Sequence, residues 1–128
     1  MARPSPVRDS VREAFGADSR HAWSLEELLE LVRQTTGRGD YSTVFRAVSM
    51  LEAEGAVRRI DVGDGRARYE PVGEHHEHVQ CDHCGRVEEV PECLAAGWAE
   101  RVRASTGFEV LGHRLTFSGL CPDCAAAG

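Results

Sequence analysis

The chain has 128 residues, the length of one ordinary domain or two small ones, so a large multi-domain enzyme is excluded. Hydrophobic residues make up 41% and aromatic residues 6%, which allows only a modest core that metal ions or a partner subunit would strengthen. The formal net charge is −6; residues 1–72 contribute −1 (11 Arg, 12 Asp and Glu) and residues 73–128 contribute −5 (4 Arg, 9 Asp and Glu). This balance excludes a non-specific polyanion binder but leaves a nearly neutral first half that can present Arg on one face.

The cysteines favour metal binding over disulfide bonds. There are five of them, an odd number, and four form two C-x-x-C pairs. No apolar segment is long enough to span a membrane, and residues 1–6 lack the apolar core of a secretory signal. We therefore expect a cytoplasmic protein without membrane association, in a reducing compartment where paired cysteines bind metal.

The first half predicts three short helices and a hairpin. The first helix ends near Gly16, a capping box of Ser24 and Glu27 opens the second, and the third runs from an N-cap at Ser42 to a left-handed Gly55. Two short strands, residues 56–60 and 66–70, follow around a glycine-rich turn. This order is typical of a winged helix, in which the third helix enters the DNA major groove. A trihelical packing unit without a DNA-binding role is the alternative.

Composition changes near residues 71–73, where a cysteine-free segment gives way to one with every cysteine and five of the six histidines. We predict two domains, residues 1–72 and 73–128, in an α+β fold. The second domain is expected to have strands at residues 78–80, 87–90 and 110–120, and a helix from Pro91 to near Gly107.

Two cysteine pairs predict a structural zinc site. Cys81 with Cys84 and Cys121 with Cys124 supply four thiolates, which satisfy a closed tetrahedral zinc ion and leave no position for substrate. A redox role for either pair would require a thioredoxin-like βαβ context, which the sequence lacks. The remaining Cys93 is expected to be a small buried helix residue, with metal ligation as the alternative.

A histidine cluster directly precedes the first cysteine pair. In an extended His75-His76-Glu77-His78 segment, His76 and His78 face one side and His75 and Glu77 the other, which indicates two metal sites. Imidazole with carboxylate suits Zn(II), Fe(II), Mn(II), Co(II) and Ni(II) without choosing among them. A zinc hydrolase or deaminase is disfavoured, because the cysteines follow too closely and four thiolates leave no room for water.

A series of motifs in fixed order extends over nearly the whole chain. They are Thr43-Val44-Phe45-Arg46 with Leu51-x-x-x-Gly55, Arg68-Tyr69-Glu70, His75-His76-Glu77-His78, Cys81-x-x-Cys84-Gly85, Gly112-His113 and Gly119-Leu120-Cys121-x-x-Cys124. In order and spacing this series resembles the ferric uptake regulator (Fur) family. The resemblance implies an N-terminal winged helix-turn-helix domain and a small α/β dimerisation domain with the structural zinc. It also implies a homodimeric repressor that binds AT-rich inverted repeats of double-stranded DNA when loaded with metal.

The resemblance implies two further metal sites. The sensory site would consist of Glu70, His76, His78 and Glu89, completed by His21. The family usually has that last histidine two residues before the helix cap, where this chain has Ala22. The second site would use His75, Glu77 and His113, with Cys93 or Glu92 replacing the usual helix carboxylate, because Ala96 stands at that position.

The resemblance also suggests DNA contacts. Phe45 stands where the family commonly has Tyr and keeps a ring for a thymine methyl group. Further candidates are Tyr41, Ser42, Thr43 and Arg46 on the third helix, Arg3 in a minor groove, and Arg66 with Arg68 on the hairpin.

The metal favoured by the resemblance is Fe(II). A zinc uptake regulator is the nearest alternative, although many of those proteins have a cysteine before the histidine cluster and residues 71–74 have none. A peroxide sensor of the same family is disfavoured by Glu70, because that branch has Asp there.

Overall fold

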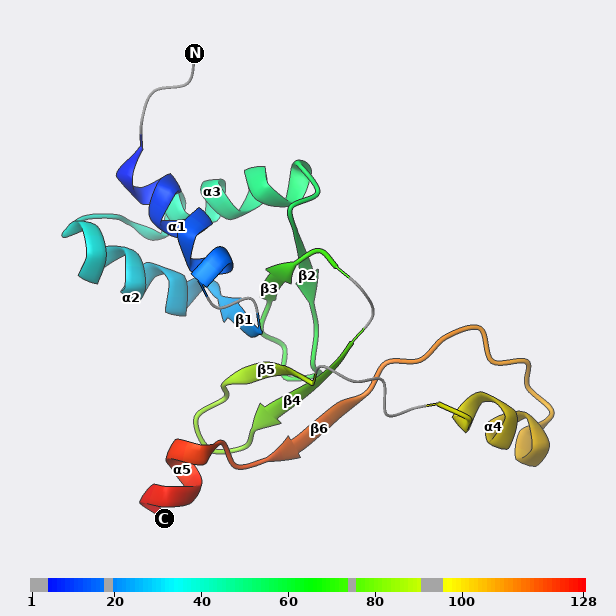
Figure 1. Cartoon of the computed structure of the whole chain (residues 1–128). Helices are drawn as coiled ribbons and strands as arrows, with labels where there is room; N and C mark the ends of the chain where they lie inside the picture. The colour runs from blue at the N-terminus through cyan, green and yellow to red at the C-terminus, as the bar shows by residue number, and fades with distance from the viewer. Residues whose placement is uncertain (1–4, 18–19, 74–75, 91–95) are drawn as a thin grey trace. The chain divides into compact units, whose positions relative to one another are not determined.

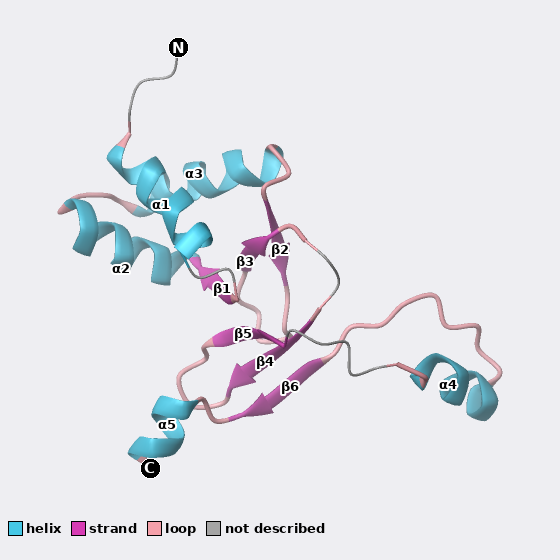
Figure 2. Cartoon of the chain, in the orientation of Figure 1, coloured by secondary structure: helices cyan, strands magenta, loops and turns pink. Residues whose placement is uncertain are grey.

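The computed structural model describes residues 5–17, 20–73, 76–90 and 96–128. The chain divides into two compact units, Met1–Gly73 and Glu74–Gly128 (Figure 1). Both units combine helices with short strands, which confirms the predicted α+β class (Figure 2).

Three helices and three strands make up the first unit. In chain order these are α1 (Pro6–Ala17), β1 (His21–Ser24), α2 (Leu25–Thr36), α3 (Tyr41–Ala53), β2 (Val57–Ile60) and β3 (Arg68–Pro71). The central strand is β3, which pairs antiparallel with both β1 and β2. The sequence predicts the helices and the hairpin correctly. It misses β1, because four residues before a helix are too few to show alternation.

One apolar core joins the three helices of this unit to the hairpin. Its members come from α1, α2, α3, β2 and β3. Leu28 at its centre is completely buried, which contributes about 1.5–3 kcal/mol relative to an exposed leucine. Val44, Val48 and Leu51 lie on the face of α3 that packs into this core, so the opposite face of α3 is exposed to solvent.

Capping side chains fix where α2 and α3 begin. The predicted capping box is present: Ser24 Oγ accepts a hydrogen bond from the Glu27 backbone N–H at 3.1 Å, and Glu27 Oε1 accepts one from the Ser24 N–H at 2.9 Å. The predicted cap of α3 at Ser42 is wrong. Asp40 Oδ1 accepts from the Thr43 backbone N–H at 2.8 Å, which lowers the pKa of Asp40. Aspartate caps as well as serine, so α3 begins two residues earlier than predicted.

The second unit is built around a three-stranded sheet. Its elements are β4 (Glu77–Cys81), β5 (Val87–Val90), α4 (Trp98–Thr106), β6 (Thr116–Gly119) and α5 (Pro122–Ala127). The central strand β4 pairs antiparallel with β5 and parallel with β6. The first two strands were expected from the sequence, and α5 was not.

Two expected boundaries in the second unit differ from the structure. The strand expected at residues 110–120 is present only as Thr116–Gly119, since that segment alone pairs with β4. The helix expected from Pro91 is described from Trp98, after a left-handed Gly97 (φ 85°), and residues 91–95 lie outside the described part.

Several large apolar side chains of the second unit are exposed. In the described residues α4 has no buried side chain, and Leu111 is 91% exposed. The others are Trp98, Val102, Phe108, Phe117 and Leu120. No helix among the described residues is long and apolar enough to cross a membrane.

Candidate metal centres and nucleic-acid interface

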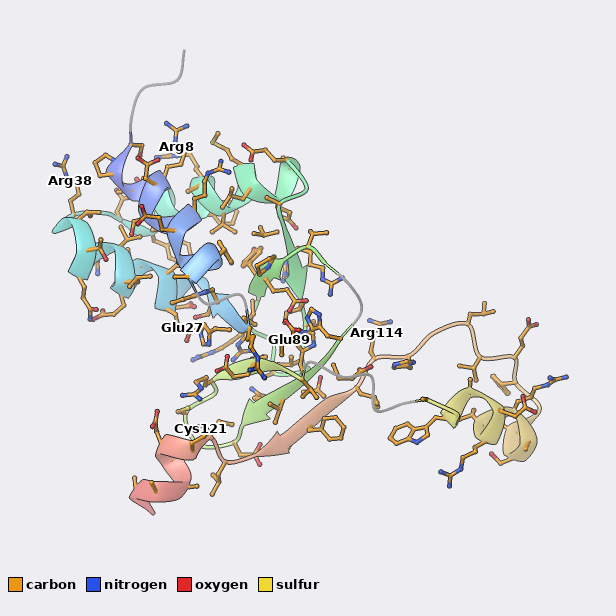
Figure 3. All side chains as sticks on the ribbon, viewed as in Figure 1. Arg8, Glu27, Arg38, Glu89, Arg114 and Cys121 are labelled. Atoms are coloured by element: carbon orange, nitrogen blue, oxygen red, sulfur yellow. The ribbon has the colours of Figure 1, made fainter. Side chains whose placement is uncertain are left out.

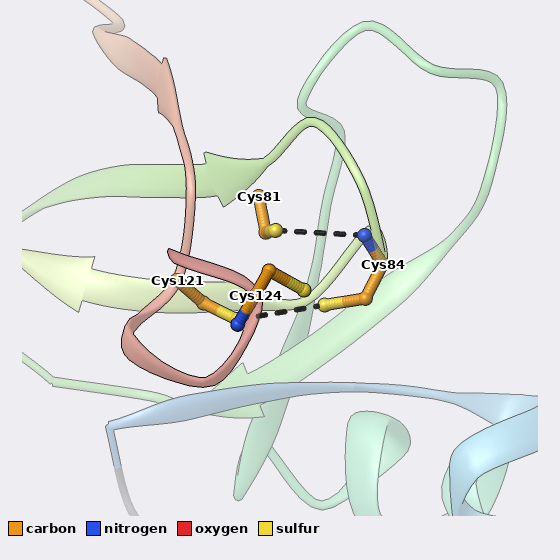
Figure 4. A group of neighbouring side chains, drawn as sticks. All are labelled: Cys81, Cys84, Cys121 and Cys124. Carbon is orange, nitrogen blue, oxygen red and sulfur yellow. Dashed lines mark hydrogen bonds between the residues drawn. The ribbon is translucent and has the colours of Figure 1, made fainter. Parts of the chain in front are cut away.

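The four predicted cysteines lie together at one end of the second unit (Figure 4). Cys81 ends β4 and Cys84 follows in the turn, whereas Cys121 caps α5 and Cys124 lies in its first turn. All four sulfur atoms lie within 4.8 Å of one another, and the Cys84 and Cys121 sulfurs are 3.8 Å apart. Zinc–sulfur bonds of about 2.3 Å in a tetrahedron give sulfur–sulfur edges of about 3.8 Å. The cluster therefore fits a structural zinc ion.

Backbone N–H groups donate hydrogen bonds to two sulfurs of this cluster. The backbone N–H groups of Cys84 and Cys124 point at the sulfurs of Cys81 and Cys121, at 3.5 and 3.4 Å. Hydrogen bonds from the backbone of Cys121 and then of Cys84 lower the pKa of Cys81 to about 5. The hydrogen bond with Cys121 raises the pKa of Cys124 to about 12. The two pKa values differ in direction, and a bound cation favours the thiolate form of every ligand.

A second group of donors lies on β4 and β5, separate from the thiolates. The rings of His76 and His78 meet edge to face, with centroids 4.9 Å apart. Glu89, labelled in Figure 3, is the cross-strand partner of His78, and its Oε1 lies 3.9 Å from Nδ1 of His76. Two imidazoles and a carboxylate of the predicted sensory site are thus brought together in this unit, as a donor set for a borderline divalent ion.

On the opposite face of β4, Glu77 belongs to a different arrangement, as strand alternation predicts. Its side chain is 1% exposed, its Oε1 lies 2.7 Å from Nε2 of His113, and its Oε2 accepts a hydrogen bond from the Leu115 backbone N–H at 3.2 Å. The structure therefore brings together Glu77 and His113 of the predicted second site. His75 and Cys93 lie outside the described residues.

Glu70 is buried on β3 beside a cation. The Arg58 Nε donates to Glu70 Oε1 at 2.9 Å, and the Glu70 side chain is 3% exposed. The two residues are cross-strand partners on β2 and β3. The sequence does not single out Arg58, because the pairing register of the hairpin, which sets Arg58 opposite Glu70, is not evident from it.

His21, the remaining sensory candidate, is bound to a helix cap. Its Nε2 lies 2.8 Å from Glu27 Oε2, and its ring packs edge to face on Trp23. Trp23 pairs with Tyr69 across β1 and β3. Continuing this register sets Ala22 opposite Glu70, so the His21 side chain projects from the other face of this sheet.

The solvent face of α3 carries the predicted DNA-contacting residues. Tyr41 and Phe45 are 50% and 48% exposed, and their rings stack with centroids 6.5 Å apart. Ser42 and Arg46 are also exposed, whereas the Thr43 hydroxyl donates to the Asp40 carboxylate at 2.8 Å. An apolar platform beside a cation is suited to thymine methyl groups and phosphate.

Of the two hairpin arginines suggested as DNA contacts, one is exposed. Arg66 is exposed in the turn between β2 and β3. Arg68 is buried instead, with its Nη1 2.8 Å from Asp64 Oδ2, so it is no DNA-contacting candidate. Arg3 lies outside the described residues.

Comparison with known proteins decides the family. The model of the ferric uptake regulator family matches residues 2–118. The chain belongs to this family. It is 30% identical over 124 residues to the ferric uptake regulation protein of Bacillus subtilis (strain 168), covering 94% of this chain and 83% of that protein. It is 34% identical over 129 residues to ferric uptake regulation protein 2 of Mycolicibacterium fortuitum, covering 98% and 87%.

A solved structure gives the same assignment. A zinc-bound manganese uptake regulator superposes with a TM-score of 0.79 at 30% identity, covering 94% of this chain and 91% of the other. The family consists of metal-responsive transcriptional regulators that bind DNA. This chain is therefore such a regulator and not an enzyme.

Proposed function

We propose that this chain is an iron-responsive repressor that binds AT-rich inverted repeats of double-stranded DNA as a homodimer. Its regulatory ligands are Glu70, His76, His78 and Glu89. His21 is the weakest of the sensory-site candidates, since Glu27 already engages its Nε2. When bound, a divalent ion would supply positive charge and directional bonds to these donors.

The observation that carries this proposal is the donor group of His76, His78 and Glu89. It offers nitrogen and oxygen ligands from two adjacent strands, apart from the four thiolates that fit zinc. A closed thiolate site supports folding, whereas exchangeable nitrogen and oxygen ligands suit an ion that is sensed. Iron is favoured by the names of the relatives in Bacillus subtilis and Mycolicibacterium fortuitum. Zinc is the first alternative, and the manganese regulator makes Mn(II) a necessary comparison.

The exposed surfaces support the DNA and dimer parts of the proposal. Tyr41, Ser42, Phe45 and Arg46 face solvent on α3, Thr43 flanks them, and Arg66 is exposed in the hairpin turn. Arg3 is a further proposed DNA contact outside the described residues. The apolar side chains of α4 and β6, Trp98 and Phe117 among them, would be covered by a second copy.

The Glu77–His113 pair holds β4 to the segment before β6 in this proposal. A second ion at that place would require His75 and Cys93 as additional ligands. The cytoplasm is the compartment in which the four thiols stay reduced.

DNA binding with defined metal ions tests the proposal. Fluorescence anisotropy would follow a DNA fragment from upstream of this gene, with Fe(II), Mn(II), Zn(II) or Ni(II) added under anaerobic, reducing conditions to protein that retains its structural zinc. We expect Fe(II) to tighten binding at least tenfold at the lowest free concentration. The variant His76→Ala should lose this response and keep its zinc, because it lacks one regulatory ligand only.

His83→Ala is the matched control, since His83 is an exposed histidine of the same unit outside the proposed site. It should respond to Fe(II) as the parent does. Equal DNA affinity with and without each ion in the parent would contradict the proposal. A response to Mn(II) or Zn(II) alone would replace iron as the sensed metal.

A further inference from the structure

The buried carboxylate of Glu70 has a cationic neighbour on its own sheet. Arg58 lies directly across from it on β2, and its Nε donates to Glu70 Oε1 at 2.9 Å. The Glu70 side chain is 3% exposed and the Arg58 side chain 40%, so the carboxylate is enclosed and the guanidinium extends toward water. A buried carboxylate keeps its charge only with such a partner.

The same guanidinium opposes a metal ion at this carboxylate in two ways. The hydrogen bond from Arg58 occupies one of the carboxylate's lone-pair sites, so an ion bound to Oε1 has to share that oxygen with the guanidinium. In addition, a fixed positive charge within hydrogen-bond distance of a ligand repels a divalent ion bound to that ligand. Both effects act on the affinity for the ion and leave the identity of the ligands unchanged.

We propose that Arg58 is a positioning residue that sets the metal concentration at which the regulator responds, by competing with the divalent ion for the Glu70 carboxylate. The inference rests on the proposed function, in which Glu70 is a regulatory ligand. Without the ion, Arg58 pairs with the carboxylate and orients it. When the ion binds, Arg58 either shares the Glu70 carboxylate with it or loses its hydrogen bond. Either change lowers the affinity of the site for the ion.

The neighbouring Arg59 provides a built-in comparison. It pairs with Tyr69 in the same ladder and is exposed on the other face of β2. Its substitution removes the same charge from the same strand and leaves the Arg58–Glu70 hydrogen bond in place. An effect specific to Arg58 therefore cannot be a general effect of net charge.

The test is a metal titration of the full chain with its structural zinc retained. Co(II) serves as the probe, because its visible absorption reports both affinity and ligand geometry, and Fe(II) and Mn(II) follow by competition. We expect Arg58→Gln to bind Co(II) about tenfold more tightly than the parent, with an unchanged absorption spectrum. Arg58→Lys keeps the positive charge, so its affinity for Co(II) should be close to that of the parent. Arg59→Gln should remain within twofold of the parent.

A double-mutant comparison separates competition from a structural effect. In the Glu70→Gln background, Arg58→Gln should no longer tighten binding, because the carboxylate for which Arg58 competes is absent. The inference is overturned if Arg58→Gln binds Co(II) like Arg59→Gln or more weakly, or if its gain persists in that background. If the parent and all variants bind no ion beyond the structural zinc, the proposed function fails, and this inference fails with it.

Discussion

The histidines of the second unit differ in the groups that they face, although three of the six in the chain stand within four positions. His76 faces His78 and Glu89, a set of donors that an ion can share. His113 is bonded to the buried Glu77, where a hydrogen bond already satisfies a carboxylate oxygen. Whether each histidine is available to a metal ion thus depends on the side chain that it contacts.

Gly39 illustrates a residue whose backbone and surroundings both exclude a side chain. Its φ is 125°, and a Cβ there would lie 2.9 Å from Cγ1 of Val32, a member of the core. We expect Gly39→Ala to destabilise the first unit by about 1–3 kcal/mol, measured by chemical denaturation. Gly16→Ala is the control, because nothing lies within 4 Å of its Cβ in α1. It should be neutral or stabilising by up to about 1 kcal/mol. Equal effects of the two substitutions would refute this account.

At the scale of elements, short contacts tie each helix end to its neighbours. The cap of α2 also engages His21 of β1 through Glu27, so strand and helix are fixed together. The cap of α3 at Asp40 fixes the start of the helix that carries Tyr41 and Phe45. The start of the helix with the proposed DNA-contacting face therefore depends on the Asp40 carboxylate.

Arg86 connects the two cysteine turns. Its Nη1 lies 3.2 Å from Asp123 Oδ2, between the cysteines of the second pair. Desolvation opposes its charge, but Glu88 and the thiols of Cys121 and Cys84 together raise the pKa of Arg86. We expect Arg86→Gln to speed zinc release to a chelator about threefold, because four thiolates lose a counter-charge. Asp123→Asn should change the rate little, since the Asp123 side chain is 87% exposed.

The control for this measurement is Arg101→Gln, an exposed arginine of α4. Zinc release would be followed with a colorimetric chelator under reducing conditions. If Asp123→Asn accelerated release as much as Arg86→Gln, the ion pair and not the charge near the thiolates would be the cause.

At the scale of the whole molecule, the two units derive their stability from different sources. The first has a core to which three helices and the hairpin contribute. In the described part of the second, the buried apolar side chains are those of Cys81 and Val87. So small an apolar interior does not by itself hold a sheet in water, and the proposed zinc ion and second copy would supply the missing support.

Zinc removal should therefore act on one unit. Treatment with a strong chelator under reducing conditions is expected to remove hydrogen-exchange protection from the amides of β4, β5 and β6, while those of α1, α2 and α3 keep it. Restoring zinc should restore protection. Full protection of β4 in zinc-free protein would show that the sheet is stable without the metal.

Much of the fold and part of the candidate site were predictable from local pattern. The capping box at Ser24, the left-handed Gly55 and the alternation of His76 and Glu77 about β4 follow from the geometry of helices and strands alone. The cap at Asp40 was missed, because two good capping residues stand close together. The short pairing segment of β6 was missed, because a partner strand defines its limits.

By itself the sequence determined the residue types, their spacing and hence the thiolate cluster and the family, since ligand pairs close in the chain must be close in space. Only the tertiary structure decided which charged and donor side chains contact one another. It placed His21 on a helix cap, buried Arg68 in an ion pair and set Arg58 against Glu70. The first two contacts join residues six and four positions apart. The Arg58–Glu70 contact depends on the register of β2 and β3, which packing fixes and a local sequence pattern does not show.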